Sequence, residues 1–352
     1  MLSKTYADVV SLSSLSVQFE TGLSDGKLYA NGRHQIGVVV SVTALDLERA
    51  PIDLTPEEII GHSWLVDYVD GTEMNRELQS GWNYSVTETK FHVGANSTLG
   101  VSQCKFFLMA ASDFTTNPKS VSVCFDLPDG TVVSTAKGGT EGFDSHVTCR
   151  GDPAKNYTND DIDLSREDTY HDSVYDQDNY YCKIKDENFH WVHIDVVDSE
   201  RFADTPYDTN NIPSEECYQY RSYWGVNKML QRLSVAVQVG PKGQTGIGTF
   251  VSARSTRDVN SNGYWQVNQR EGQVTIVRVT ADGTFANVPE TVTDMNLEYQ
   301  NVRFYDQYGN TGAFYVKPSD DGNTLSLIDG QTTPYPYASP DTRTPTPRGA
   351  SR

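Results

Sequence analysis

Strict alternation of apolar and polar side chains marks the clearest elements of this chain. Between His34 and Ala44 every second position is apolar, at Ile36, Val38, Val40, Val42 and Ala44. A second segment repeats the pattern at Leu233, Val235, Val237 and Val239. A period of two is the repeat of a β-strand with one buried face. Further runs of strand character are Tyr84–Val93, Val101–Ala110, Ser120–Asp126, Gln273–Thr280 and Ala313–Lys317.

Turn signals separate these runs, and helix signals are rare. Dipeptides and tripeptides that favour turns stand at Asp25-Gly26, Pro128-Asp129-Gly130, Asp282-Gly283, Gly309-Asn310 and Asp321-Gly322. The best helix signal has Thr55 as N-cap, Pro56 as first helical residue and two glutamates in the first turn. Many short strands with frequent turns predict an all-β fold: two tandem antiparallel β-sandwich domains, immunoglobulin-like or jelly-roll-like, with few short helices.

A change in composition divides the chain. From Gly151 to Tyr180 there are eight Asp and one Glu against Lys155 and Arg166, and few aliphatic side chains. Such a stretch does not hold a core by itself. We therefore expect an N-terminal arm (1–13), a first domain (14–150), an acidic, Tyr-rich connection (151–178), a second domain (179–330) and an extended, Pro-rich tail (331–352).

Charge and cysteine content narrow the partners. The net charge of the 352-residue chain is −19, and it has no basic cluster, which argues against nucleic acid and anionic membranes as partners. The five widely spaced cysteines contain no CxxC pair, and we expect buried free thiols. The first 25 residues contain no apolar run of signal-peptide length, so we expect synthesis in the cytoplasm without an export signal.

Polar groups with the potential for chemistry are scattered. In a strand over His190–Asp195, His193 and Asp195 share one face and His190 lies on the other, so we interpret them as exposed strand residues rather than metal ligands. Acidic side chains near Asp160 and the segment 258–269 are weak calcium candidates. Nucleophile-elbow and phosphate-loop motifs are absent from the sequence. We expect no catalytic residues, no metal ion and no cofactor.

Aromatic side chains are the strongest candidates for contact with partners. Tyrosine is abundant, with 20 residues, and its large amphipathic ring is enriched at interfaces. The alternatives are that the rings cover loops of their own domain or bind sugars. The candidate partner-binding residues are Tyr170, Tyr175, Tyr180, Tyr181, Tyr218, Tyr220, Tyr223, Trp224, Tyr335, Pro336 and Tyr337.

Two short segments resemble a known family. Leu28–Gln35, which leads into the first alternating strand, resembles the opening strand of virion-associated β-domain proteins of tailed bacteriophages. Tyr305–Asn310, also followed by an alternating strand, resembles hairpins of immunoglobulin-like modules in surface and phage proteins. The resemblance implies a non-enzymatic structural protein of a virion (tail, collar, baseplate or capsid decoration). Its partners would be other virion proteins and further copies of itself.

Two alternatives stay open at this point. One is a protein that binds or cleaves surface glycans during host recognition, and the other is a bacterial adhesin module. Binding of sugar fragments that raises the melting temperature would distinguish the first alternative from the structural role.

Overall fold

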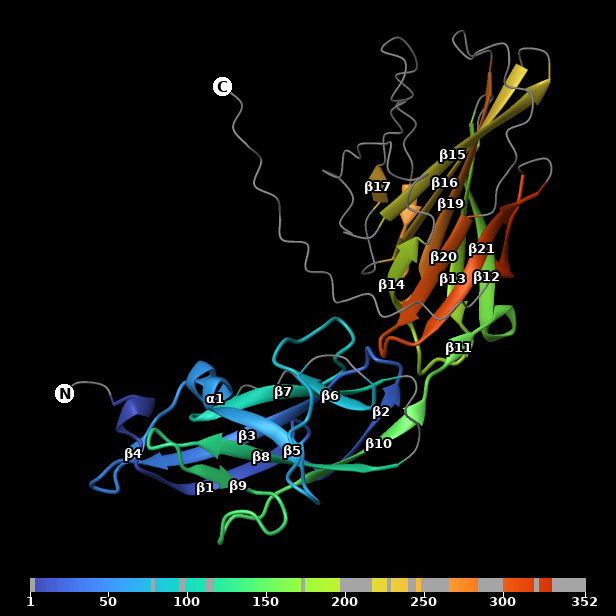
Figure 1. The fold of residues 1–352 in the computed structure, drawn as a ribbon. Coiled ribbons are helices and arrows are strands. Elements are labelled where there is room, and N and C mark those ends of the chain that lie inside the picture. The colour runs from blue at the N-terminus through green and yellow to red at the C-terminus, as the bar shows by residue number, and fades with distance from the viewer. Residues whose placement is uncertain are drawn as a thin grey trace, which may run out of the picture.

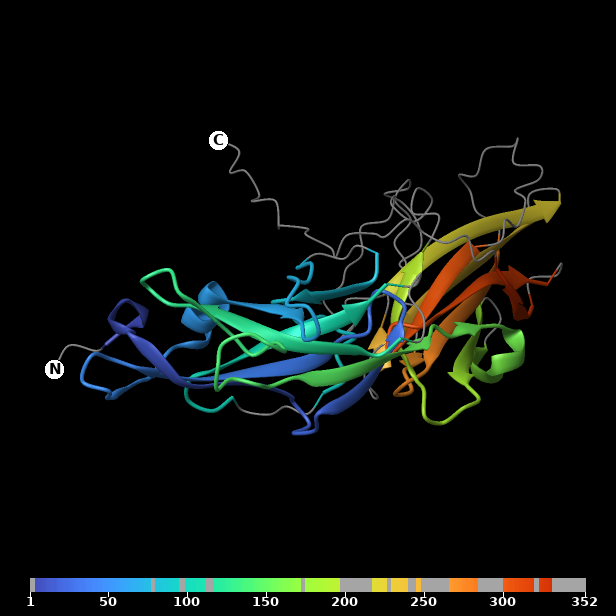
Figure 2. The ribbon, with the colours of Figure 1, turned by 60° about the horizontal axis from the view of Figure 1, so that its bottom comes forward.

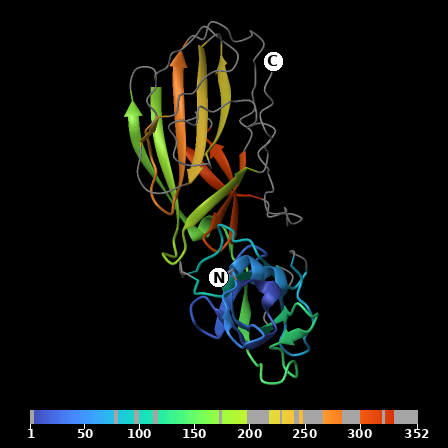
Figure 3. The same cartoon turned by 90° about the vertical axis from the view of Figure 1, so that its left-hand side faces the viewer.

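The chain folds into two β-domains arranged end to end (Figures 1 and 3). The computed structural model describes residues 4–76, 80–94, 99–111, 117–171, 175–196, 217–226, 229–239, 245–247, 266–283, 300–319 and 323–330. Strands dominate both domains, and the expected all-β sandwich class is confirmed. In the described residues no helix is long and apolar enough to cross a membrane.

Two five-stranded sheets form the first domain. One sheet has the order β1 (Ser11–Phe19), β3 (Ile36–Leu45), β7 (Gln103–Ala110) and β6 (Trp82–Ser85), with β4 (Pro51–Ile52) beside β3. The other has the order β2 (Asp25–Ala30), β10 (Val147–Pro153), β8 (Lys119–Asp126) and β5 (Ser63–Asp67), with β9 (Val132–Ser134) beside β8. The predicted alternation is confirmed in β3, where Val38, Val40, Val42 and Ala44 are buried in one core with residues of the second sheet.

The predicted helix is confirmed as α1 (Pro56–His62), which follows β4. The hydroxyl of Thr55 accepts a hydrogen bond from the Glu58 N–H, and the Glu58 carboxylate accepts one from the Thr55 N–H. This reciprocal pair satisfies two donors that the first turn leaves open. Ile59 is fully buried and anchors the helix to the core of the first domain.

The second domain is also built from two sheets around its own core. One has the order β11 (Asn156–Tyr157), β21 (Thr311–Pro318), β20 (Gln300–Asp306) and β14 (Trp191–Val196), with β22 (Leu325–Asp329) beside β21. The other runs β12 (Ile162–His171), β13 (Tyr175–Ile184), β19 (Val274–Gly283), β16 (Met229–Val239) and β15 (Cys217–Val226). A small ribbon joins β17 (Thr245–Ile247) and β18 (Gln266–Asn268). Figure 2 shows the long strands of both domains from a second direction.

The acidic stretch differs from its prediction as a connection. Residues 162–171 form β12, which pairs with β13 along the edge of the second domain, and the link between the domains is reduced to the residues between β10 and β11. The low aliphatic content of this stretch is compatible with a strand, because an edge strand buries only part of its side chains. The charged side chains also discourage pairing with the edge of another sheet. Ile162 is buried, whereas Asp163 and Asp168 are not.

Two further expectations need correction. The sheets are mixed rather than purely antiparallel, since β10 runs parallel to β2 and β11 runs parallel to β21. Asp25-Gly26 is the start of β2 and not a turn, and Gly26 pairs with Cys149. A Cβ atom on Gly26 would lie 2.8 Å from side-chain atoms of Phe19 and Ile36. Close packing, rather than turn geometry, therefore accounts for this glycine.

The expectation of buried free thiols is confirmed for four cysteines, Cys104, Cys124, Cys149 and Cys182. Burial raises the pKa of Cys104, Cys149 and Cys182 to about 12, so these thiols stay protonated at neutral pH. The side chain of Cys217 lies outside the described residues.

Candidate functional site

Polar and aromatic side chains from distant parts of the chain meet at the junction between the two domains. On the side of the first domain it is formed by the turn between β2 and β3. The side-chain oxygen of Asn31 accepts hydrogen bonds from the N–H groups of Arg33 and His34, both at 2.9 Å. Its amide nitrogen donates across the junction to the Tyr308 carbonyl at 2.8 Å and to the Asn310 side chain at 3.1 Å. One buried side chain thus shapes the turn and cross-links the domains.

On the side of the second domain the junction is formed by the turn between β20 and β21. The fully buried carboxylate of Asp306 accepts hydrogen bonds from the N–H groups of Tyr308 (2.8 Å) and Asn310 (2.9 Å). It also accepts from the Tyr157 hydroxyl at 2.7 Å and the Asn310 amide at 3.0 Å. Burial raises the pKa of Asp306, and these hydrogen bonds to the ionised form only partly offset that effect.

Glycine is required at position 309 of this turn. Gly309 has a φ of +74°, in the left-handed region that favours glycine. A Cβ atom at this position would lie 2.6 Å from the Cβ of Arg33 and 3.2 Å from the Phe91 ring. The predicted turn at Gly309-Asn310 is therefore confirmed, and it packs directly against Arg33 and Phe91 of the first domain.

Aromatic rings fill the space around these hydrogen bonds. The ring centroid of Tyr308 lies 4.8 Å from His34 in an edge-on arrangement and 5.5 Å from Tyr29. The Arg33 guanidinium lies 5.1 Å from the centroid of Tyr305. Phe91 of the first domain packs 5.7 Å from Tyr305. Such ring pairs add to the stabilisation from buried area, so the contact is specific as well as apolar.

A polar group closes one rim of the junction. The Lys90 ammonium lies 2.8 Å from Nδ1 of His193, and Nε2 of His193 lies 3.1 Å from the Asp195 carboxylate. The prediction that His193 and Asp195 share a strand face is confirmed by this contact. The interpretation of His193 as an ordinary exposed residue is wrong, because only 18% of its side chain is exposed and it contacts the first domain. The partner Lys90 is 103 residues away in sequence, so strand periodicity gave no signal for it.

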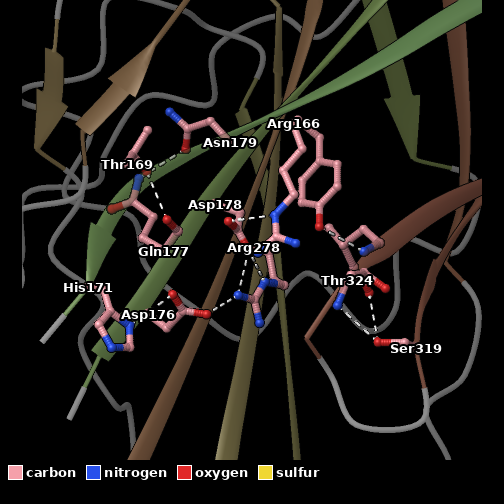
Figure 4. A network of polar contacts seen from close by, with 12 residues as sticks. Arg166, Thr169, His171, Asp176, Gln177, Asp178, Asn179, Arg278, Ser319 and Thr324 are labelled. Carbon is pink, nitrogen blue, oxygen red and sulfur yellow. Dashed lines mark hydrogen bonds and ion pairs between the residues drawn. The ribbon is translucent and has the colours of Figure 1, made fainter. Parts of the chain in front are cut away.

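A second polar network lies inside the second domain and is shown in Figure 4. The fully buried Arg278 of β19 donates from Nε to Asp178 of β13 at 2.8 Å and also forms an ion pair with Asp176. Arg166 of β12 donates to the other oxygen of Asp178 at 2.8 Å. This hydrogen bond raises the pKa of Arg166. The network neutralises its own charges and ties three neighbouring strands together, so it is a structural element.

A third group lies in the first domain around a buried glutamate. The Glu20 carboxylate contacts the Lys105 ammonium at 2.7 Å and Nε2 of His92 at 2.5 Å, and Nδ1 of His92 lies 2.6 Å from the exposed Glu88. Burial alone would raise the pKa of Glu20, but the hydrogen bonds from Lys105 and His92 outweigh it and hold the pKa below its usual value. Among the described residues no group of three or more His, Cys, Asp or Glu side chains is placed to hold a metal ion.

The predicted partner-binding residues fall into three sets. Tyr170 on β12 is 46% exposed. Tyr180 and Tyr181 are buried: the Tyr180 hydroxyl accepts a hydrogen bond from the Leu325 N–H, and the Arg270 guanidinium lies 3.5 Å from the centroid of Tyr181. These two rings pack within their own domain and are unavailable to a partner. The remaining residues are placed by backbone alone or lie outside the described part: Tyr175 on β13; Tyr218, Tyr220, Tyr223 and Trp224 on β15; and Tyr335, Pro336 and Tyr337.

Comparisons with known proteins add little to this geometry. No protein-family model matches the chain, and no curated protein matches it. Among solved structures, the collagen-binding domain of the Erysipelothrix rhusiopathiae surface protein RspB is similar at 11% identity, over 93% of this chain and 95% of that chain, with a TM-score of 0.18. A TM-score this low carries no argument about fold or function.

Proposed function

We propose that this protein is a non-enzymatic structural component of a bacteriophage virion, which acts by holding protein contacts at a fixed spacing. The observation that carries the proposal is the junction. The two segments that resemble phage and surface modules, Leu28–Gln35 and Tyr305–Asn310, contact each other there across the two domains. The resemblance therefore falls on the residues that lock the domains together, and not on two unrelated turns.

A locked junction suits an assembly protein for a physical reason. Domains joined only by a short linker and a small polar contact move relative to each other. Here Asn31 is buried and donates hydrogen bonds to Tyr308 and Asn310 of the other domain, and aromatic rings of both domains pack around this contact. Opening the junction would exchange these hydrogen bonds for bonds to water, at a net cost of about 0.5–1.5 kcal/mol for each bond, and would expose the aromatic rings to water. We therefore infer that the two domains move as one unit.

The proposed partners are other virion proteins and further copies of this chain. Stable contacts of this kind bury about 1,200–2,000 Å² and usually close by symmetry. Tyr170, exposed on the edge strand β12, and the Pro-rich segment 331–352 are the candidate contact regions.

Affinity capture tests the proposal. The tagged chain is recovered from a lysate of its native source, and the proteins bound to it are identified by mass spectrometry. The proposal predicts recovery of tail, collar, baseplate or capsid proteins in fixed stoichiometry. A matched chain that ends at Gly330 should fold with the same melting temperature and recover less of these partners. Recovery of the intact chain alone would contradict the proposal.

A further inference from the structure

His193 contacts the first domain in a way that requires one protonation state of its ring. Its Nδ1 lies 2.8 Å from the Lys90 ammonium, and its Nε2 lies 3.1 Å from the carboxylate of Asp195 on the same strand. An ammonium group only donates hydrogen bonds, and an ionised carboxylate only accepts them. Nδ1 must therefore be the acceptor and Nε2 must carry the proton, so the contact fits the neutral ring.

Asp195 fixes this orientation of the ring. Burial opposes the ionised form of its carboxyl group, but hydrogen bonds from His193 and Tyr305 outweigh burial and hold the pKa of Asp195 below its usual value. The Tyr305 hydroxyl donates to one carboxylate oxygen, and the other oxygen faces Nε2 of His193. The carboxylate therefore stays ionised at mildly acidic pH and keeps the ring in place through Nε2.

Protonation of His193 reverses the contact with Lys90. The added proton binds at Nδ1, because Nε2 already carries one. The ring then has no acceptor for the ammonium group, and it presents a second positive charge at the position where the ammonium group lies. An attraction between the two domains thereby becomes a repulsion.

The other groups near the ring add to this repulsion. Burial, assisted by Asp195, raises the pKa of Tyr305 to about 12, so this neighbour stays uncharged. The charged and titratable side chains that pack around His193, directly or through Tyr305 and Asp195, are Lys90 between β6 and β7, Asp195 on β14, Arg303 and Tyr305 on β20, and Arg33 between β2 and β3. Among them the cations outnumber the carboxylate, so a further positive charge on the ring is unfavourable.

The segment that carries Lys90 stays on the first domain when the pH falls. Two positions further along, the ring nitrogens of His92 lie 2.5 Å from the Glu20 carboxylate and 2.6 Å from the Glu88 carboxylate. Both carboxylates accept hydrogen bonds, so a protonated His92 satisfies both contacts. Acid therefore preserves the attachment of this segment to its own domain, and the contact that breaks is the one between Lys90 and His193.

We propose that the contact between His193 and Lys90 is an acid-sensitive switch for the relative movement of the two domains. The neutral ring restrains the domains, and the protonated ring gives them more freedom, while the hydrogen bonds of Asn31 keep them joined. A histidine ordinarily titrates near pH 6.5, so the change falls between about pH 7.5 and 5. His34 takes no part, because its pKa of about 3 keeps it neutral in the folded protein over this range. The switch does not depend on a role in a virion.

Double electron–electron resonance on the full chain tests the proposal. Spin labels are attached through Ser13→Cys on β1 and Ser165→Cys on β12, two exposed positions in different domains, in a Cys217→Ser background. The four buried thiols are protected from the label by the fold. The distribution of distances between the labels is measured from pH 7.5 to pH 5.0, and NMR follows the protonation of His193 over the same range. We expect the distribution to be at least about 1.5 times as wide at pH 5.0, with a midpoint that coincides with the protonation of His193.

Two variants assign the change to this contact. His193→Asn keeps an acceptor for Lys90 but does not titrate, and Lys90→Met removes the cation that the protonated ring repels. Each should give a distribution of the same width at both ends of the pH range. Lys137→Met, which removes an exposed lysine of the first domain in the loop after β9, is the matched control and should keep the pH dependence of the parent chain. The proposal is overturned if the width for the parent chain does not change with pH, or if either variant still broadens at pH 5.0 as the parent does.

Discussion

Acidification should destabilise the protein through one buried histidine at the junction. His34 is 6% exposed, and its Nδ1 accepts a hydrogen bond from the Tyr29 N–H at 2.8 Å. That bond requires an unprotonated Nδ1, so the neutral ring is the form that fits. Burial, assisted by the nearby His92, lowers the pKa of His34 from 6.5 to about 3.

The sign and size of the effect follow from linkage. Between pH 6.5 and about 3 the unfolded chain binds a proton at His34 that the folded chain does not bind. The contribution of His34 to the free energy of unfolding is therefore fully present above pH 6.5 and is lost as the pH falls from 6.5 towards 3. One pKa unit corresponds to about 1.4 kcal/mol, so lowering the pH from 7 to 5 should cost about 2 kcal/mol from this residue alone.

The comparison of the parent chain with His34→Asn isolates this contribution. The side-chain oxygen of asparagine is the same number of bonds from the backbone as Nδ1 of histidine and accepts a hydrogen bond, but asparagine does not titrate. The free energy of unfolding is measured by urea titration at pH 7 and pH 5 for both chains. The parent should lose about 2 kcal/mol more than the variant between these pH values. Equal losses in both chains would refute the reasoning, because all other titrating groups are shared.

Two further substitutions test the junction and the buried network. Gly309→Ala should lower the free energy of unfolding by about 1–3 kcal/mol, because a Cβ atom at this position meets Arg33 and the backbone has a positive φ. The same variant should broaden the distribution of distances between the domains in small-angle scattering. An unchanged melting curve would show that this turn does not stabilise the junction. Arg278→Met should cost about 3–5 kcal/mol because it leaves Asp178 buried without its main partner. The matched variant Arg166→Met, whose side chain is 42% exposed, should cost about 1 kcal/mol or less in the same denaturant titration. Equal losses in the two Arg variants would contradict this ranking.

Local patterns predicted much of the fold. The alternation over Ile36–Ala44 and the capping residues around Thr55 act within a few positions, and β3 and α1 follow them closely. Strand β12 is not predictable from the apolar repeat, because an edge strand exposes most of its side chains and keeps polar residues on both faces. The start of β2 was missed because Asp25-Gly26 is a turn signal by composition, whereas tight packing against Phe19 determines its conformation.

No local sequence pattern predicts the contact between the two domains. Asn31 and Tyr308, which form its central cross-link, are 277 positions apart. The sequence singled out both segments through their turn residues, but gave no reason to bring them together.

Quantitative mass spectrometry of particles from the native source, purified by density gradient, tests directly whether this chain is a virion component. A virion component should be present in intact particles in a fixed copy number relative to head or tail proteins, and should stay bound after a high-salt wash. Particles that contain none of the chain, while it remains free in the same lysate, would contradict the proposed function.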